Sequence, residues 1–510
     1  MISVNRWPLL AAVAAGLVLT ATDMYVIAGV LPSMVTDLEI SSGHLEQATP
    51  LLTGFLAAYM AAIAVAGPIA DRYGVEPVYL GGLAIFGVGS VLTAAADQLA
   101  LAVLGRTLQG LAGGSLVPVA FAVAARFAAR QQGRAVGLAT AAQELGSVVG
   151  PVYGAAVVTA ATRFAGWRLI FWLNIPLAAF AAAAFAAARR RSTSATAATA
   201  RAGIDWAGAA LLACALGLAV IAVYPDRPAA SATGTHFWVL FPPALGLFGL
   251  FVLRQRTAVL PLLPPRALEG ARSLLPLAAI FLAGAALAVG VVNLPLLGRL
   301  VFDLDELGAA GLLARFMVLV PIGAALGGWA HDRVGVATPA AIGLLAAAGA
   351  FWLMSDWTQA EPARHLGPVG EIDLVLPVAG LGLGLALTPL TIVVLDVAGL
   401  AHRGATAGLA VLTRTGGMLA GVSLLGAVGL HRFYELLEKG PALTARPGSP
   451  EFARQSAAVG AWITSSLVAE YQQVFRVTAV LCLAAALIAV AAEGIPRRKA
   501  KHSRGAPLQS

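Results

Sequence analysis

The fold of this chain is decided by long apolar stretches such as residues 9–35, which read LLAAVAAGLVLTATDMYVIAGVLPSMV. The stretch shows no alternation of polar and apolar positions, so it does not fit a strand of an outer-membrane barrel. It is also too long for the apolar region of a secretory signal peptide. We predict a membrane-spanning helix here, because only a helix satisfies all backbone polar groups within such a run.

The composition extends this interpretation to the whole chain. Of the 510 residues, 59% are hydrophobic and 11% are charged, whereas soluble proteins carry roughly 25% charged residues. Apolar runs bounded by charged residues, Gly or Pro predict an all-α membrane protein with fourteen spans, at about 8–34, 48–70, 77–96, 99–125, 135–160, 167–188, 207–224, 237–253, 273–298, 307–330, 336–354, 372–397, 405–430 and 472–492.

The two halves of the chain repeat one another. GPIADRYG at 67–74 and GWAHDRVG at 328–335 each follow the second span of a half. Such repeats are typical of secondary transporters. We predict an N-terminal six-helix half (1–188), a cytoplasmic linker (189–206), two inserted helices (207–253), an amphipathic cytoplasmic linker (254–272), a C-terminal six-helix half (273–494) with an extracytoplasmic segment (431–471), and a basic cytoplasmic tail (495–510).

The net charge of +8 reflects topology and indicates no nucleic-acid partner. Arg and Lys gather in alternate gaps between the apolar runs, while the gap after the first span holds Asp37, Glu39 and Glu46 without a basic residue. Loops rich in Arg and Lys stay in the cytoplasm. We therefore expect both termini in the cytoplasm.

Two acidic residues and one arginine are expected near mid-depth in the membrane. An unpaired Asp23 in the first span could take up a proton, and the alternative is a static hydrogen bond between helices. Glu144 lies in the fifth span, and Arg414 occupies the position in the repeat that corresponds to Gln143. We predict that Glu144 and Arg414 form a pair that opens in another conformation; the alternative is a static buried pair. Asp23 and Glu144 are thus the candidates for proton coupling.

The fourth span places Arg106, Gln109, Gly110 and Gly114 on one helical face. A charge inside an apolar stretch is costly unless it is paired, so Arg106 is a candidate functional residue or else a snorkelling structural one. Arg315 is a further intramembrane charge, nearer the outer surface. We assign Tyr25, Gln109 and Gln143 to a substrate cavity.

Small residues predict close helix packing and a gate in the fifth span and in its repeat. In the fifth span these residues are Gly146, Gly150, Pro151 and Gly154, and in its repeat they are Gly417 and Gly421. Gly110 and Gly114 of the fourth span are assigned the same role.

The repeated loop predicts a conformational latch at the cytoplasmic end. Asp71 and its counterpart Asp332 can accept hydrogen bonds from a neighbouring helix N-terminus, and Arg72 and Arg333 can pair with the other half. A polar loop that only sets topology is the alternative.

Six motifs together resemble those of a known family, and they cover nearly the whole chain. They are Asp23 with Leu31 and Pro32, Gly67–Gly74, Arg106–Gly110, Gly146–Gly154, Gly166–Pro176 and Asp205–Gly208. On these residues the chain resembles the major facilitator superfamily, specifically its fourteen-span drug:proton antiporter-2 group. Val75, Glu76 and Pro77 depart from the basic residues usual after the loop motif, and Tyr25 and Ala28 depart from the first-helix signature. In having a tyrosine, Tyr25, two residues after Asp23, the chain resembles a mycobacterial branch of this group that is implicated in exporting triacylglycerides.

The resemblance implies a proton-coupled exporter of hydrophobic or amphiphilic compounds in the bacterial cytoplasmic membrane, of the multidrug-efflux type. The alternatives are lipid export and, from a different class, a non-transporting sensor or scaffold. We expect a monomer whose partners are a small hydrophobic or amphiphilic substrate, protons and membrane lipids, with the proton gradient in place of a cofactor. The sequence shows no His/Cys cluster, nucleophile elbow or phosphate-binding loop that would indicate an enzyme. Residues 431–471 could form a protrusion that guides an amphiphile, or a solvated loop.

Overall fold

The computed structural model describes residues 6–40, 45–160, 166–191, 203–223, 234–263, 270–366, 369–397, 402–441, 444 and 448–493. The predicted tail (495–510) and most of the linker (189–206) lie outside these residues, as do parts of 254–272 and of 431–471.

The described part of the chain is almost entirely helical. The N-terminal half contains α1 (Trp7–Asp37), η1 (Leu45–Ala48), α2 (Pro50–Tyr73), α3 (Val75–Ala94), α4 (Leu99–Ala124), α5 (Ala129–Ala160) and α6 (Arg168–Arg191). The inserted helices are α7 (Trp206–Val223) and α8 (Phe237–Thr257). The C-terminal half contains α9 (Ala271–Leu300), α10 (Glu306–Val318), α11 (Val320–Val334), α12 (Ala337–Met354), η3 (Glu361–Ala363), β1 (His365–Leu366), β2 (Val369–Gly370), α13 (Glu371–Val397), α14 (Arg403–Ala420), η5 (Gly421–Leu425), α15 (Gly426–Leu437) and α16 (Pro450–Glu493).

Local sequence explains where several of these helices begin and end. Prolines stand in the first turns of α1, α2 and α11, where a missing backbone N–H removes no helical hydrogen bond. Gly74 and Gly335 end α2 and α11 with φ of 92° and 84°, values that favour glycine. The two halves therefore turn sharply at corresponding points, directly after Arg72-Tyr73 and Arg333-Val334.

Thirteen helices of the described part are long and apolar enough to cross a membrane. The predicted span that is not among them is 135–160, which folds as part of α5; Gln143 and Glu144 in its middle lower its mean hydropathy. α5 packs along α1 and α11 within the bundle. The chain is thus a multi-pass membrane protein, and the count of fourteen spans stays a prediction.

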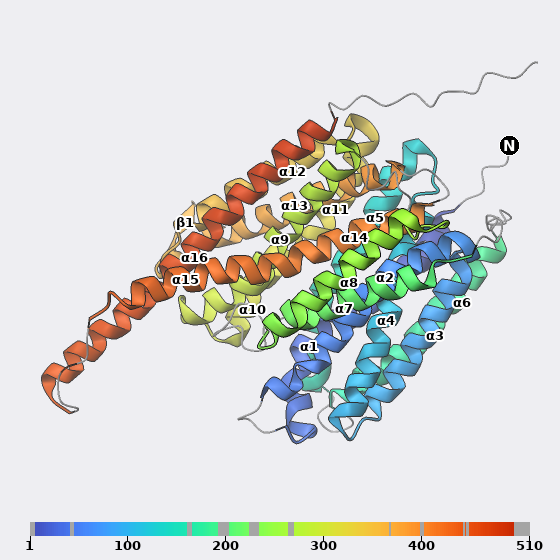
Figure 1. Ribbon diagram of the computed structural model, residues 1–510. Coiled ribbons are helices and arrows are strands. Elements are labelled where there is room, and N and C mark those ends of the chain that lie inside the picture. Colours follow the sequence, from blue (N-terminus) through green and yellow to red (C-terminus); the bar gives the residue numbers. More distant parts are fainter. Residues whose placement is uncertain are drawn as a thin grey trace, which may run out of the picture.

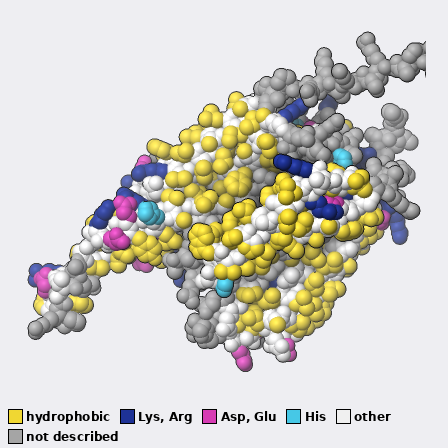
Figure 2. All heavy atoms as spheres, viewed as in Figure 1, with side chains coloured by type: hydrophobic (Ala, Val, Ile, Leu, Met, Phe, Trp, Pro, Cys, Tyr) yellow, Lys and Arg dark blue, Asp and Glu magenta, His cyan; other side chains and the backbone are white. Residues whose placement is uncertain are grey.

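The helices form two groups that lie side by side, with α1–α6 in blue to green and α9–α16 in yellow to red (Figure 1). Each group has its own apolar core. The inserted α7 packs against α2 and α8. Apolar side chains cover most of the visible bundle surface, which suits contact with lipid tails (Figure 2).

α15 and the first part of α16 extend beyond the bundle as an antiparallel pair, which we call the arm (Figure 1). Trp462 Nε1 of α16 donates a hydrogen bond to the Leu436 carbonyl of α15 over 3.0 Å. The chain from Pro450 onward returns along α15 and runs without a break into the last predicted span, so α16 is one helix of 44 residues. The end of the bundle from which the arm extends is the arm end.

The sequence also did not predict two breaks in regular helix. The span expected at 307–330 divides into α10 and α11 at Leu319, just before Pro321. The π-helical turn η5 separates α14 from α15 where the chain passes toward the arm. Between α12 and α13, β1 and β2 form a two-stranded antiparallel pair.

Candidate functional site

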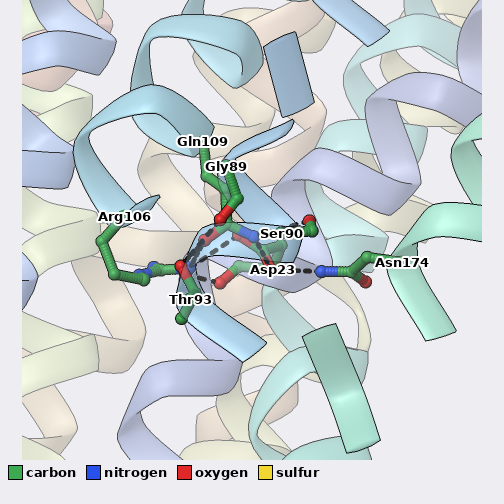
Figure 3. Close-up of polar contacts among 7 residues, drawn as sticks. All are labelled: Asp23, Gly89, Ser90, Thr93, Arg106, Gln109 and Asn174. Atoms are coloured by element: carbon green, nitrogen blue, oxygen red, sulfur yellow. Dashed lines mark hydrogen bonds and ion pairs between the residues drawn. The ribbon is translucent and has the colours of Figure 1, made fainter. Parts of the chain in front are cut away.

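Asp23 lies at the centre of a buried polar network in the N-terminal half (Figure 3). Arg106 Nη1 of α4 donates to Asp23 Oδ2 over 2.7 Å, and both side chains are 0% exposed. Asp23 Oδ1 accepts from Gln109 Nε2 at 3.0 Å and from Asn174 Nδ2 of α6 at 2.7 Å. Ser90 of α3 accepts a further hydrogen bond from Gln109 Nε2 at 3.0 Å. The network therefore joins α1, α4 and α6 at the Asp23 carboxylate and adds α3 through Gln109.

These contacts correct two expectations. Asp23 is not an unpaired carboxylate, because it forms an ion pair with Arg106 and accepts two amide hydrogen bonds. Gln109 does not line the cavity, because its side chain is fully buried against Asp23 and α3. The Arg106 guanidinium, in contrast, lies 4.4 Å from the centre of the Phe55 ring, a cation–π contact at the cavity wall.

A second charge pair joins the two halves of the molecule. Arg414 Nη1 of α14 donates to Glu144 Oε1 of α5, so the predicted pair is present. Beside it, Gln143 Nε2 donates to the Tyr59 hydroxyl of α2 over 3.4 Å. Glu144 and Arg414 are both largely buried, so separating them would leave two charges without a partner in a place of low polarity.

A cavity of about 360 Å³ lies between the halves next to this pair. Tyr25, Tyr59, Gln143, Glu144, Arg414 and Thr415 form a polar region, with Arg106 at its edge. The remaining wall is apolar and is formed by Ala21, Met24, Ile27, Leu52, Phe55, Leu56, Val223, Ala288, Val291, Val292, Met418, Leu419 and Val422. Tyr25 and Gln143 thus lie where the sequence analysis assigned them.

At the opposite end from the arm, two aspartates join the halves; we call this the latch end. Asp71 of α2 accepts hydrogen bonds from the Gly404 and Ala405 N–H groups at the start of α14, each at 2.8 Å. Asp332 of α11 accepts from the Gly133 and Arg134 N–H groups near the start of α5, at 2.8 and 3.1 Å. Each carboxylate thus meets the positive end of a helix in the other half.

The arginines of the repeated loop do not take the part expected of them. Within the described residues, Arg72 forms no ion pair. Arg333 stacks on the Trp329 ring of its own helix, with 3.6 Å between Cζ and the ring centre. A different residue adds a link between the halves: Asp396 of α13 accepts a hydrogen bond from Gln132 of α5 over 2.9 Å.

The small residues pack the helices that carry these groups. A Cβ at Gly146 or Gly150 would collide with α1 at Ala21, Thr22 or Tyr25, and one at Gly154 would meet Val26. Pro151 lies within α5 on the same stretch. Gly417 and Gly421 face Phe281 and Ala285 of α9 in the same way, while Gly110 and Gly114 face the Phe55 and Tyr59 carbonyls of α2.

Arg315 lies at the surface of the bundle and is paired with an acid of a neighbouring helix. Its side chain is 45% exposed and donates to Asp373 Oδ1 of α13 over 2.6 Å, near the arm end. Sequence reasoning also missed Asn174, Ser90 and Thr93, which complete the Asp23 network. Ser90 and Thr93 fall three residues apart in an apolar run, a helical spacing that could have indicated a shared polar face.

The fold and this arrangement of charges define a membrane transporter, and comparison with known proteins agrees. The profile of the Major Facilitator Superfamily matches residues 13–422, and the chain belongs to this superfamily. Two solved structures share its fold: a human organic anion transporter (TM-score 0.62, 16% identity, 95% of this chain and 99% of the other) and a proton:xylose symporter (TM-score 0.58, 15% identity, 94% and 95%).

Among characterised sequences, the chain is similar to proteins named triacylglyceride transporters. That of Mycobacteroides abscessus is 38% identical over 450 residues, covering 86% of each chain. That of Mycolicibacterium smegmatis is 36% identical over 498 residues, covering 96% of this chain and 88% of the other. That of Mycobacterium tuberculosis is 35% identical over 488 residues, covering 93% and 92%.

Proposed function

We propose that this transporter exports a neutral lipid across the bacterial cytoplasmic membrane and that proton uptake drives it. The observation that carries the proposal is the cavity: its wall is mostly apolar, and Glu144, the one acid among the described residues that line it, is paired with Arg414. A site for lipophilic cations needs an excess of negative charge, which this lining does not supply. The mycobacterial relatives named triacylglyceride transporters support the same substrate class.

The positions of the latches and the cavity suggest which way the protein faces. Arg and Lys gather at the latch end, so this end belongs in the cytoplasm with both termini. The cavity residues of α2 lie near its start at Pro50, and Asp71 lies at its other end. This is the arrangement of a carrier closed toward the cytoplasm, with its cavity on the outer side.

Proton coupling is proposed to run through Asp23. Taking up a proton would remove the negative charge that Arg106 now faces at 2.7 Å, and Arg106 in turn lies against Phe55 of the cavity wall. α1 also packs closely on α5 at Gly146 and Gly150, next to Glu144. A change at Asp23 can therefore reach the Glu144–Arg414 pair through both helix packing and Arg106, and opening that pair would free the halves to move.

The arm offers a route for an apolar substrate beyond the cavity. α14 lines the cavity as far as Leu419, η5 adds Val422, and the chain then continues into α15. Exposed apolar side chains follow, Leu424 in η5 and then Tyr434 and Ile463 on the arm. We propose that a lipid leaving the cavity follows this surface, and that the protein does this as a monomer.

The test is transport in proteoliposomes with an imposed pH gradient, using a fluorescent triacylglyceride analogue and a cationic dye as separate substrates. We expect gradient-driven movement of the lipid analogue, its loss with Asp23→Asn, and normal movement with the exposed control Asp97→Asn. Movement of the dye alone would instead support a multidrug exporter. Absence of any gradient-dependent flux would contradict both and favour the sensor or scaffold class.

A further inference from the structure

The segment after α8, residues 258–263, folds back onto the latch end. Gln255 of α8 holds it by two hydrogen bonds: its Nε2 donates to the Leu263 carbonyl over 2.6 Å, and its Oε1 accepts from the Leu262 N–H over 3.2 Å. One side chain thus replaces the backbone partners that a strand or helix would have supplied. The segment is held in one position relative to α8.

The inserted helices hold the base of this segment. Asp205 accepts the Gly208 N–H at the start of α7 over 3.0 Å and also pairs with Arg254 of α8 through Nε at 2.7 Å. The Asp205 carboxylate is almost fully buried. α7 and α8 are therefore tied together at the latch end, directly before Gln255.

The segment presents two leucines to the protein and exposes Val259 and Leu260. Leu262 is 2% exposed and Leu263 is 5% exposed, whereas Val259 is 95% exposed. Two leucines of the predicted amphipathic linker (254–272) are thus buried in protein. Leu268 lies outside the described residues.

Leu262 and Leu263 lie in an apolar cluster that includes residues of both halves. They belong to one apolar cluster with Ala64 of α2 and Ala405 of α14, and Leu409 and Leu412 of α14 pack against it. Ala405 is also one of the two residues whose N–H binds Asp71, at 2.8 Å. The cluster of the two leucines therefore lies beside the α2–α14 latch, on the side of the inserted helices.

The other latch has no such cover. Around Asp332, the backbones of Gly133 and Gly328 come into direct contact, and the cluster of Leu262 and Leu263 contains no residue of α5 or α11 among those the structure describes. Only the α2–α14 side of the latch end is thus tied to the inserted helices by this cluster.

We propose that Leu262 and Leu263 act as a hydrophobic bolt that holds α2 and α14 together at the latch end, so that the inserted helices set the balance between the two transport states. Alternating access requires α2 and α14 to separate at this end, and separation exposes the two leucines or strips them from one helix. Apolar side chains favour the state that buries them. The bolt is independent of which substrate is carried.

The test uses the full-length protein with Cys214 and Cys482 replaced by alanine and spin labels at Tyr73→Cys on α2 and His402→Cys beside α14. Double electron–electron resonance then gives the distribution of distances between the two labels, and from it the populations with the latch closed and open. We expect Leu262→Ala with Leu263→Ala to raise the open-to-closed ratio at least about tenfold, from the loss of two buried leucines. Gln255→Ala, which releases the segment and keeps both leucines, is expected to shift the ratio in the same direction.

Two controls separate the bolt from a general loss of packing. Val259→Ala with Leu260→Ala alters the exposed part of the same segment, and Leu263→Met keeps the buried volume; both are expected to match the wild type. An unchanged distance distribution in the folded leucine variant would overturn the proposal. If that variant does not fold, Gln255→Ala decides: a shift supports the bolt, and no shift rules it out. If the wild type does not transport lipid, the proposed function is wrong, but the distance measurement still tests the bolt.

Discussion

The two halves of the molecule share a fold and differ in what they place at its centre. Gly110 faces the Phe55 carbonyl and Gly380 faces the Phe316 carbonyl, so α4 and α13 correspond residue by residue. Four positions before these glycines stand Arg106 in one half and Leu376 in the other, both fully buried.

Asp23 and Ser90 of the network have apolar counterparts as well. Gly146 faces Ala21 and Gly417 faces Phe281, which sets Asp23 opposite Ala283. Gly82 and Gly343 occupy corresponding places in α3 and α12 against α4 and α13, which sets Ser90 opposite Phe351. Ala283 and Phe351 are both buried apolar residues.

The difference teaches that the shared fold does not need the polar network. The C-terminal half reaches the same packing with an apolar core, so hydrogen bonds and an ion pair are not what holds such a half together. Buried charges in a membrane are costly, and their retention in one half only points to a role in the transport cycle. The N-terminal half would thus take up the proton, at Asp23. The C-terminal half would contribute Arg414, whose pairing with Glu144 would respond to that proton.

The largest effect is expected from breaking the Asp23–Arg106 pair on one side. Arg106→Leu copies Leu376 but leaves Asp23 buried with a charge and no cation, which should cost about 3–5 kcal/mol of stability. Adding Asp23→Ala, which copies Ala283, is expected to recover most of that loss while gradient-driven transport stays absent. Thermal unfolding in detergent and proteoliposome flux measure the two quantities. A double variant that still couples transport to protons would show that the network is structural.

Replacing a packing glycine should affect the two halves equally. Gly110→Ala and Gly380→Ala each drive a methyl group into a backbone carbonyl, of Phe55 and of Phe316, and overpacking of this kind costs about 1–3 kcal/mol. Gly81→Ala is the control, because a Cβ there meets nothing within 4 Å. Thermal unfolding of the three variants checks this. Unequal losses at Gly110 and Gly380 would contradict the residue-by-residue correspondence on which the comparison depends.

Much of this organisation could be predicted from the sequence, for reasons that differ between features. The repeated glycines identified equivalent helices, so the Glu144–Arg414 pair could be inferred from one helix lying opposite its copy. The partner of Asp23 could not, because the face of α1 that meets α4 depends on how the helices rotate in the bundle. Gln109 was misplaced for the same reason: periodicity puts it on the face of Arg106 without showing that it turns toward α3.

The features at the two ends of the bundle were harder to predict. Asp71 and Asp332 were expected to meet helix N-termini because their motif repeats, but the sequence does not say that Arg333 prefers Trp329 of its own helix. α16 packs closely on α15, where Gly429 leaves room for Val474 and Glu470, and this pairing of helices does not follow from the sequence pattern. Leu262 and Leu263 resemble other leucines of an amphipathic segment, and only their burial in a cluster with Ala64 of α2 and Ala405 of α14 distinguishes them.

A smaller effect is expected at the latches, where the halves can again be compared. Asp71→Asn and Asp332→Asn each replace a carboxylate that accepts two helical N–H hydrogen bonds by a neutral amide. The loss of interaction energy should be about 0.5–2 kcal/mol. Because the leucine bolt also holds α2 and α14, Asp71→Asn should open its latch less than Asp332→Asn opens the other. Label pairs across each latch measure this in the same protein. Equal opening at both sites would argue against an asymmetric latch end.

The smallest effect is expected in the loop between α12 and α13, where the C-terminal half keeps a buried acid outside the membrane. Glu361 is fully buried, neither of its oxygens accepts a hydrogen bond, and Arg364 Nη1 lies 3.3 Å from Oε2. Burial and the nearby Glu371 carboxylate raise the pKa of Glu361 to about 7, although Arg364 lowers it. The corresponding loop between α3 and α4 is short and spans only Ala95 to Gln98.

This pKa fixes the direction of a pH effect on stability. The folded state favours protonated Glu361, so its contribution is constant at pH values below the ordinary pKa of 4.5 and is lost as pH rises toward 7. Glu361→Gln imitates the protonated form and should leave the melting temperature unchanged near pH 4.5 but raise it by about 1–3 °C at pH 8. Asp356→Asn, at an exposed acid of the same loop, is the control. A shift of equal size at both pH values would mean that the gain comes from packing of the amide, and the acid would then have no part in how this half differs from the other.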